Sequence, residues 1–301
     1  MFRRKDAVSQ DTVPDQVEAA LKHLAAGEAV SAIAILTACI KQAPNEAQLW
    51  FLLAEAHVAN NDKPNASIAY KEYLARDVMD VMRAGPRLFA LDRSTSDKVI
   101  SMEYVEKTFD DYAFRFETTL VGALNYKVPV ALAETVKAYS AGPFARILDL
   151  GCGTGLCSTP FEGQGIIEGV DVSTGMLNKA SEKGIFNELH RADVVTFLKE
   201  TSSQYDLVLC GDVLIYIGVP DETFHGVAKV LTPNGLFAFS IQKLTEGEII
   251  LGSDRRFWHS HDYIDRALRA SGLNVEVCKE TTLRLEEGEG VPGLIFVVKK
   301  I

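Results

Sequence analysis

The chain has 301 residues, about twice the usual size of a single domain, so its length favours two domains. Apolar residues make up 47% and charged residues 24%, values typical of a globular protein with a hydrophobic core. The formal net charge of −10 argues against generic binding to nucleic acid or to anionic membranes, which requires a basic surface. No apolar run reaches the ~18 residues that a membrane span needs, so no membrane partner is expected.

Residues 1–6 are mostly charged and no apolar segment follows them, so we expect no secretory signal. The five cysteines form no C-x-x-C pair, and no histidine lies at a zinc-ligand spacing from them. They are Cys39, Cys152, Cys157, Cys210 and Cys278. Their odd number and their scatter indicate reduced thiols in a cytoplasmic protein and no metal site.

The N-terminal part of the chain repeats itself with a period of 34 residues. The shift places Ala20 on Ala54, Ala32 on Ala66, and His23 on His57. Small residues at a fixed period allow two antiparallel helices to approach closely, so the pattern predicts stacked helix pairs. We expect the two histidines to pack or to line a groove rather than to bind a metal.

This repeat resembles the tetratricopeptide repeat over about residues 13–80. The second copy matches the consensus at Trp50, Leu53, Ala54, Ala66 and Tyr70. The first copy departs from it at Gln16, where the family prefers tryptophan. The resemblance implies a concave groove that binds a protein partner. Because two repeats are fewer than such arrays usually need, packing on the neighbouring domain or a homodimer contact is the alternative.

A less regular region separates the repeats from the rest of the chain. Residues 84–102 carry turn formers and charges without periodicity, which predicts a linker. A helix is expected over about residues 104–122, because Phe109, Tyr112 and Phe116 recur at helical spacing. A second helix should follow it.

From Ala145 onward, strands alternate with helices, which predicts a mostly parallel sheet covered on both faces. The expected strands begin near residues 146, 166, 186, 205, 236, 274 and 294. Ligands of such sheets bind at the carboxyl ends of the strands. Pro160 falls where the helix after the first strand should run, so that helix must be short or kinked.

Three features after successive strands predict a pocket for an adenine nucleoside. The first strand ends in the loop Asp149-Leu-Gly151-Cys-Gly153-Thr-Gly155. Asp171 ends the second strand, where a carboxylate can accept both ribose hydroxyls. Asp193 follows the third strand, where it would accept from the adenine amino group or else cap the next helix.

The details of the loop argue against a dinucleotide. A dinucleotide loop would need glycine at position 156, which is Leu156, so a nicotinamide-dependent reductase is excluded. Asp149 faces the loop and would repel a pyrophosphate, whereas a ligand with an ammonium or sulfonium charge suits it.

With these motifs, residues 104–301 resemble the class I S-adenosylmethionine-dependent methyltransferases, and the whole chain resembles predicted bacterial methyltransferases with N-terminal tetratricopeptide repeats. The run Phe109-Asp-Asp-Tyr-Ala-Phe-Arg-Phe is similar to their pre-core helix. The resemblance implies an α/β, Rossmann-like seven-stranded sheet of order 3-2-1-4-5-7-6 behind an all-α domain. We expect a repeat domain over residues 1–85, a linker with pre-core helices over 86–140, and a methyltransferase domain over 141–301.

The resemblance also implies which residues bind S-adenosylmethionine and its product S-adenosylhomocysteine. Asp149 would support the ammonium group, and the backbone at Gly151, Cys152 and Gly153 would lie against the methionyl part. Asp171 would hold the ribose.

Five further residues complete the cofactor site that the resemblance implies. Met176 would pack on the adenine, and Asp193 with the backbone of Val194 would bind the adenine edge. Tyr112 and Arg115 would close over the cofactor, or else serve in packing and on the surface.

The methyl acceptor is harder to read from the sequence. Asp212 and Tyr216 follow the fourth strand, in a segment that borders both cofactor and acceptor in the related family. Asp212 would orient the acceptor or cap a helix. No Asn-Pro-Pro-Tyr motif for nucleobase or glutamine nitrogens is present.

A second polar segment, Arg255-Arg256-Phe-Trp-His259-Ser-His261, follows the fifth strand. Its arginines would contact an anionic acceptor, and one histidine would take the acceptor's proton. The alternative is a lid that only excludes water.

Two functional hypotheses follow. In the first, the protein is an enzyme (EC 2.1.1.-) that methylates an oxygen or nitrogen atom of a small molecule, with Asp212, Tyr216, His259 and His261 as catalytic candidates. In the second, it is an interaction module whose methyltransferase domain modifies a protein partner or serves as a scaffold.

Overall fold

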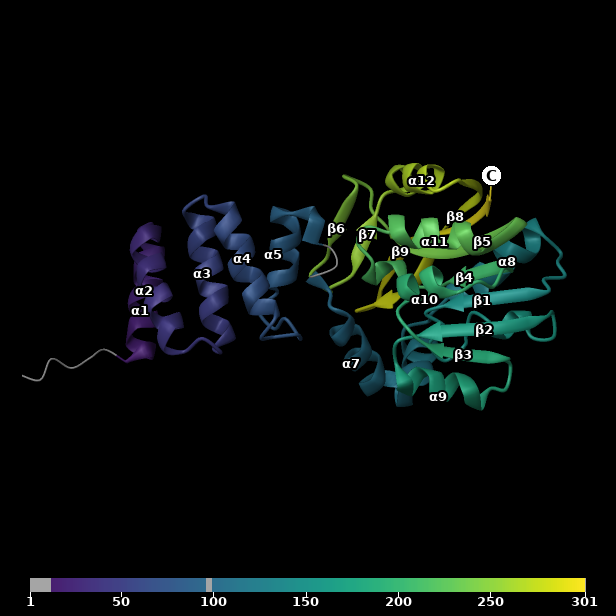
Figure 1. Ribbon diagram of the computed structural model, residues 1–301, viewed down its shortest axis with the longest axis horizontal. Helices are drawn as coiled ribbons and strands as arrows, with labels where there is room; N and C mark the ends of the chain where they lie inside the picture. The colour runs from purple at the N-terminus through teal and green to yellow at the C-terminus, as the bar shows by residue number, and fades with distance from the viewer. Residues whose placement is uncertain (1–11, 96–98, 301) are drawn as a thin grey trace, which may run out of the picture. The chain divides into compact units, whose positions relative to one another are not determined.

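The structure of the protein is a computed structural model that describes residues 12–95 and 99–300. The chain divides into two compact units, Met1–Val99 and Ile100–Ile301 (Figure 1). This division falls within the range 86–140 that was expected to hold the linker and pre-core helices. The expectations for residues 1–11 and for residues 96–98 of the linker lie outside the described residues. Among those that are described, no helix is long and apolar enough to cross a membrane.

Paired helices form the described part of the first unit. They are α1 (Val13–Ala25), α2 (Ala29–Gln42), α3 (Ala47–Ala59), α4 (Lys63–Leu74) and α5 (Ala84–Leu91), followed by the 3₁₀ turn η1 (Arg93–Thr95). The four repeated alanines have no exposed surface, which is what close helix packing requires. The linker that was expected to start at residue 84 begins instead with helix α5, whose Leu88 and Phe89 are buried. The sequence pattern did not predict this helix because its first residues include turn formers.

The two histidines of the repeat have one structural role in both copies. The Nδ1 atom of His23 pairs with Glu28, and that of His57 lies 3.2 Å from Asp62. Both acids are the N-cap residues of the following helices α2 and α4. Each histidine therefore ties the end of one helix to the start of the next.

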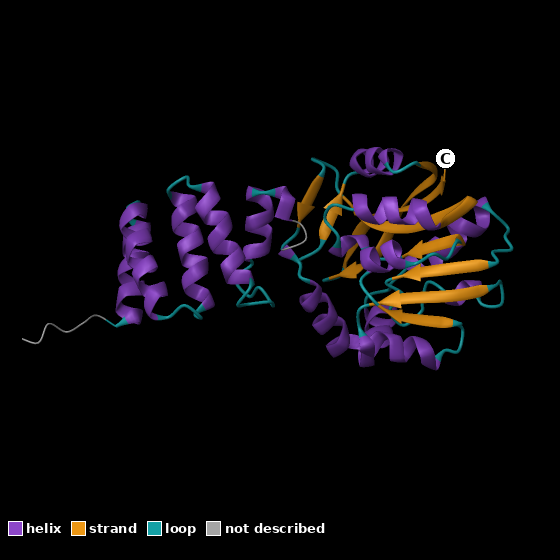
Figure 2. Cartoon of the chain, viewed as in Figure 1, coloured by secondary structure: helices purple, strands orange, loops and turns teal. Residues whose placement is uncertain are grey.

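The second unit is built on a sheet of seven core strands. Counted in chain order, these strands lie in the predicted order 3-2-1-4-5-7-6, in which the sixth and seventh are the last two strands of the chain. The core strands are β1 (Arg146–Leu150), β2 (Ile166–Asp171), β3 (Glu188–Arg191), β4 (Tyr205–Cys210), β5 (Leu231–Lys243), β8 (Leu273–Glu286) and β9 (Glu289–Lys300). The first five are parallel, and β9 lies antiparallel between β5 and β8 (Figure 2). A hairpin of β6 (Ile249–Leu251) and β7 (Phe257–His259) pairs with the end of β5.

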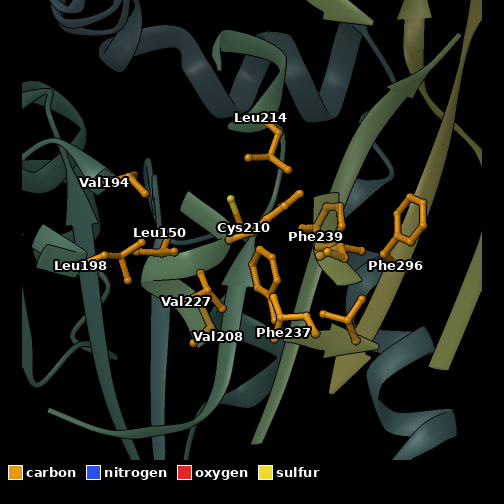
Figure 3. Packing of buried hydrophobic residues seen from close by; sticks show 14 of the residues in the cluster. Leu150, Val194, Leu198, Val208, Cys210, Leu214, Val227, Phe237, Phe239 and Phe296 are labelled. Carbon is orange, nitrogen blue, oxygen red and sulfur yellow. The ribbon is translucent and has the colours of Figure 1, made fainter. Parts of the chain in front are cut away.

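Alternating strand residues bury apolar side chains on both faces of this sheet. One face packs against α10 (Val194–Glu200), α11 (Asp221–Val230) and α12 (His261–Ala270). Figure 3 shows this side, where the rings of Phe237 and Phe239 have centroids 4.7 Å apart and those of Phe239 and Phe296 have centroids 4.9 Å apart. The other face packs against α8 (Val128–Tyr139).

One expected helix is broken into shorter pieces, and another is short, as predicted. The segment over residues 104–122 breaks into α7 (Met102–Tyr112), the 3₁₀ turn η2 (Ala113–Arg115) and the π-helical turn η3 (Thr118–Ala123). After the glycine loop only the 3₁₀ turn η4 (Thr159–Phe161) forms, because Pro160 prevents a longer helix. Helix α9 (Thr174–Glu182) begins as expected, with Ser173 as its cap.

Candidate functional site

A cavity of about 360 Å³ lies in the second unit, bordered by residues at the carboxyl ends of β1, β2, β3 and β4. Its loop side consists of Gly151, Gly153, Asp171, Asp193 and Val194. Its arginine side consists of Tyr126, Asp212, Arg256 and Arg284. Open parallel sheets bind their ligands at this edge, so the cavity is the candidate active site.

The glycine loop takes a backbone shape that glycine alone adopts easily. Gly151 and Gly153 have φ angles of 63° and 52°, and a Cβ atom on Gly151 would overlap Val213. Asp171 fixes this loop, since its two carboxylate oxygens accept the backbone N–H groups of Gly153 at 2.8 Å and of Ser173 at 2.9 Å. Burial raises the pKa of Asp171. The backbone can therefore approach a ligand closely here, beside a nearly buried carboxylate.

Asp149 lies beneath the loop and does not border the cavity. It is 1% exposed, and its Oδ2 atom accepts from the Ser158 hydroxyl at 2.6 Å. Its Oδ1 atom is buried without a hydrogen-bond partner in the described part of the chain. Burial raises the pKa of Asp149 to about 7. A cation bound near this carboxylate would supply the missing partner, which fits the ammonium group of S-adenosylmethionine.

Asp193 both caps α10 and borders the cavity. Its Oδ1 atom accepts the Thr196 N–H at 2.9 Å, which is the capping alternative weighed from the sequence. Because a carboxylate has two oxygens, capping leaves Oδ2 able to accept from a ligand.

Besides Asp149, three predicted cofactor residues do not reach the cavity wall. Met176 is a fully buried residue of α9, and Val172, just before that helix, borders the cavity instead. Cys152 is buried behind the loop, while Arg115 is exposed and lies over the Tyr112 ring at 5.8 Å. Tyr112 itself does border the cavity.

Helix α7 covers the cavity through aromatic side chains and is held in place by carboxylates. The ring of Phe109 contacts that of Tyr216 edge-on, with centroids 5.5 Å apart. Asp110 accepts from the Ser173 hydroxyl and the Gly175 N–H, and the bond from Ser173 is the main cause of its lowered pKa. Glu117, after η2, accepts from the Thr154 hydroxyl of the loop.

Charged side chains form a continuous network on the arginine side. Arg284, on β8, donates from Nη1 to Asp212 at 3.2 Å and from Nε to Glu286 at 2.8 Å. Glu286 also binds Arg256, from the turn of the β6–β7 hairpin. Burial raises the pKa of Glu286, but the two guanidinium groups outweigh this effect and the pKa is lowered. Asp212 accepts from the Ser240 hydroxyl as well, at 3.0 Å.

Two tyrosines complete the arginine side. Burial raises the pKa values of Tyr126 and Tyr216, so both hydroxyl groups stay protonated near neutral pH and remain hydrogen-bond donors. The structure thus brings the predicted residues Asp212 and Tyr216 to the cavity.

The structure corrects the expectation for the two histidines. His259 is fully buried outside the cavity, and its Nε2 atom donates to the Gly218 carbonyl at 2.9 Å. Burial lowers its pKa to about 4. His261 starts α12, where its ring lies against Asp262 at 3.1 Å and does not border the cavity. Neither ring is placed to take a proton from a ligand in the cavity.

Sequence reasoning missed Arg284, Glu286 and Tyr126. Nothing in the residue pattern distinguished them, because each belongs to an ordinary strand or loop segment. Arg256 was predicted to contact the acceptor, but the catalytic role in its segment was assigned to the histidines.

One group of possible metal ligands occurs among the described residues: Glu168, Glu188 and His190. Glu168 already accepts from Tyr205 at 2.8 Å and pairs with Arg146. The group does not border the cavity, and we assign no metal to it.

Comparisons with known proteins agree with this geometry. Residues 148–237 match the family described as a methyltransferase domain, and residues 23–82 match the tetratricopeptide repeat. The ubiquinone biosynthesis O-methyltransferase of Hydrogenovibrio crunogenus is 25% identical over 184 residues, which are 56% of this chain and 74% of the relative. Its counterpart in Aromatoleum aromaticum is 30% identical over 100 residues, 32% of this chain and 43% of that protein.

Among solved structures, the 1,6-didemethyltoxoflavin-N1-methyltransferase of Burkholderia thailandensis, with bound 1,6-didemethyltoxoflavin and S-adenosylhomocysteine, has a TM-score of 0.52. The match covers 66% of this chain and 89% of that one at 17% identity, which shows a common fold.

The fold and the glycine-loop site define a methyltransferase of the Rossmann-like class. The chain contains a methyltransferase domain of the S-adenosylmethionine-dependent class, and it carries an N-terminal tetratricopeptide-repeat region. S-adenosylmethionine is its cofactor.

Proposed function

We propose that the protein transfers the methyl group of S-adenosylmethionine to an oxygen atom of a small aromatic molecule. One observation carries this proposal: a single cavity joins the loop side to an arginine side covered by aromatic rings. Phe109, Phe116 and Tyr216 line the cavity, where Phe109 contacts both other rings edge-on, so together they offer a planar molecule an aromatic wall to pack against. The O-methyltransferase relatives support oxygen over nitrogen as the acceptor atom.

On the loop side, the backbone at Gly151 and Gly153 would lie against the methionyl part and Asp171 would hold the ribose hydroxyls. Asp193 and Val194 would bind the adenine edge, and Tyr112 would close over it. When bound, S-adenosylmethionine supplies a methyl group on a sulfonium, which is a good leaving group. The protein's contribution is therefore alignment of the two reactants and exclusion of water.

Asp212 and Tyr216 orient the acceptor in this proposal. Asp212 is already bound by Arg284 and by Ser240, so it acts by holding Arg284 in place rather than as a free base. In this proposal a phenolic acceptor releases its proton to bulk water before the methyl group is transferred, so no residue of the cavity is assigned as a general base.

The experiment is methyl transfer from radiolabelled S-adenosylmethionine into a metabolite extract and, separately, into a protein extract. We expect label in the metabolite fraction and none with the Asp171→Ala variant. Label confined to proteins would favour the second hypothesis, in which the protein modifies a macromolecular partner. Label in neither fraction would contradict enzymatic methyl transfer to both classes.

We also propose that the repeat unit binds a protein partner or a second copy of the chain. The likeness to the tetratricopeptide repeat supports this, since such helix pairs present a concave surface. Light scattering of the full chain and of residues 100–301 tests the homodimer. A dimer that persists without the repeats would contradict that role.

A further inference from the structure

The guanidinium group of Arg284 is buried at the wall of the cavity and is incompletely satisfied. The residue is 2% exposed, and Nε and Nη1 donate to Glu286 and Asp212. Its Nη2 atom has no hydrogen-bond partner within the described residues, although it carries two N–H groups. A buried charged donor without a partner costs free energy, so such groups in folded proteins usually receive an acceptor from water or a ligand.

The residues around the Nη2 atom of Arg284 indicate which kind of ligand atom it binds. Glu286 and Asp212 hold Arg284 in one orientation, and Glu286 also fixes Arg256, so both guanidinium groups are kept at the cavity wall. Tyr126 adds a hydroxyl donor on the same side. A fixed planar guanidinium beside a hydroxyl donor is suited to an oxygen that bears negative charge, and bonds between charged partners are the stronger ones.

We propose that the methyl acceptor carries an anionic oxygen, a carboxylate or a phenolate, and that Arg284 binds this oxygen through Nη2. Arg284 is thus the residue that selects charged over neutral acceptors. The inference rests on the proposed small-molecule function, and it names the substrate class for the arginine side of the same cavity.

Calorimetry with four probes tests the proposal on the full chain, with and without S-adenosylhomocysteine. The first pair is 3,4-dihydroxybenzoate and its methyl ester, which differ in the carboxylate charge. The second pair is 4-nitrocatechol, whose phenol is largely ionised at neutral pH, and catechol. We expect the charged member of one pair to bind at least about tenfold more tightly than its neutral counterpart. Preference in the first pair identifies a carboxylate, and preference in the second a phenolate.

The variant is Arg284→Lys, which keeps the positive charge between Asp212 and Glu286 but removes the Nη2 donors. Its charged-to-neutral preference should fall to within about threefold, while its affinity for S-adenosylhomocysteine stays at the wild-type value. The matched control is Arg255→Lys, a buried arginine that stacks on Tyr104 and does not border the cavity. This control should keep the preference.

Two results would overturn the proposal: equal affinities within both pairs for the wild type, including no binding at all, or an unchanged preference in Arg284→Lys. The wild-type comparison stands even where the variant fails to fold. A wild-type protein that binds no S-adenosylhomocysteine would instead contradict the proposed function, and the probe pairs on the unloaded protein would still decide the role of Arg284.

Discussion

Replacing Asp171 with asparagine should weaken cofactor binding almost as much as replacing it with alanine. The carboxylate accepts two backbone N–H groups, from Gly153 at 2.8 Å and from Ser173 at 2.9 Å, one on each oxygen. Asparagine has one oxygen and one NH₂ group, so one backbone N–H would face another donor. The amide therefore disturbs the glycine loop and also loses the charge that would bind the ribose.

The expected magnitude follows from these contacts. A backbone hydrogen bond contributes about 1 kcal/mol, and hydrogen bonds to a charged group contribute about 1.5–3 kcal/mol. Losing one loop bond and the charged ribose contact should cost roughly 3 kcal/mol, which is on the order of a hundredfold in the dissociation constant. Alanine loses both loop bonds but introduces no opposed donors, so its effect should be similar.

Isothermal titration with S-adenosylhomocysteine measures both variants, and thermal unfolding checks that they are folded. The matched control is Asp206→Asn. Asp206 also accepts two backbone N–H groups, of Ala145 and Arg146, but at the opposite end of the sheet. That change should lower stability and leave the affinity alone. Binding by Asp171→Asn within about threefold of the wild type would refute the reasoning.

Three further predictions concern pH, catalysis and domain organisation. The raised pKa of Asp149, about 7, means that the native state keeps a proton that the unfolded chain releases near pH 4. Stability of the ligand-free protein should therefore fall as pH rises from about 4 to 7, by at most roughly 4 kcal/mol, and Asp149→Asn should flatten this slope in denaturant unfolding. A flat wild-type profile would contradict the burial argument. His259→Gln should lower the melting temperature, and His261→Ala should not. Both should keep the wild-type pH–rate profile, so an inflection near pH 6.5 that either change removes would restore a catalytic histidine. A fragment of residues 100–301 should bind S-adenosylhomocysteine with the affinity of the full chain, since every residue lining the cavity belongs to that unit. If calorimetry shows weaker binding by the folded fragment, the repeats contribute to cofactor binding.

The sheet order could be predicted because its signals are local. A glycine loop after an apolar run requires a particular backbone shape, and acidic residues at the following strand ends fix the spacing of the strands. The helical repeat could be predicted for the same reason, since a fixed period of small residues can be recognised in the sequence alone.

The arginine side could not be predicted because it depends on strand register. In β8, Leu283 and Arg284 are consecutive and both buried, which breaks the alternation expected of a strand. The cause is an irregular register between Thr282 and Arg284 in the pairing of β8 with β9. Side-chain direction after such a bulge cannot be read from residue types. The same holds for His259, which the short β6–β7 hairpin turns into the interior.

The two sides of the cavity come from separate stretches of the chain. Residues 151–194 supply the loop side, whereas the two arginines of the other side, Arg256 and Arg284, belong to the β6–β7 hairpin and to β8. Mutations in the hairpin and in β8 can therefore accumulate without touching the glycine loop or Asp171. A lineage of such enzymes can therefore change its preference among methyl acceptors through drift in these C-terminal segments, while it inherits the cofactor site intact.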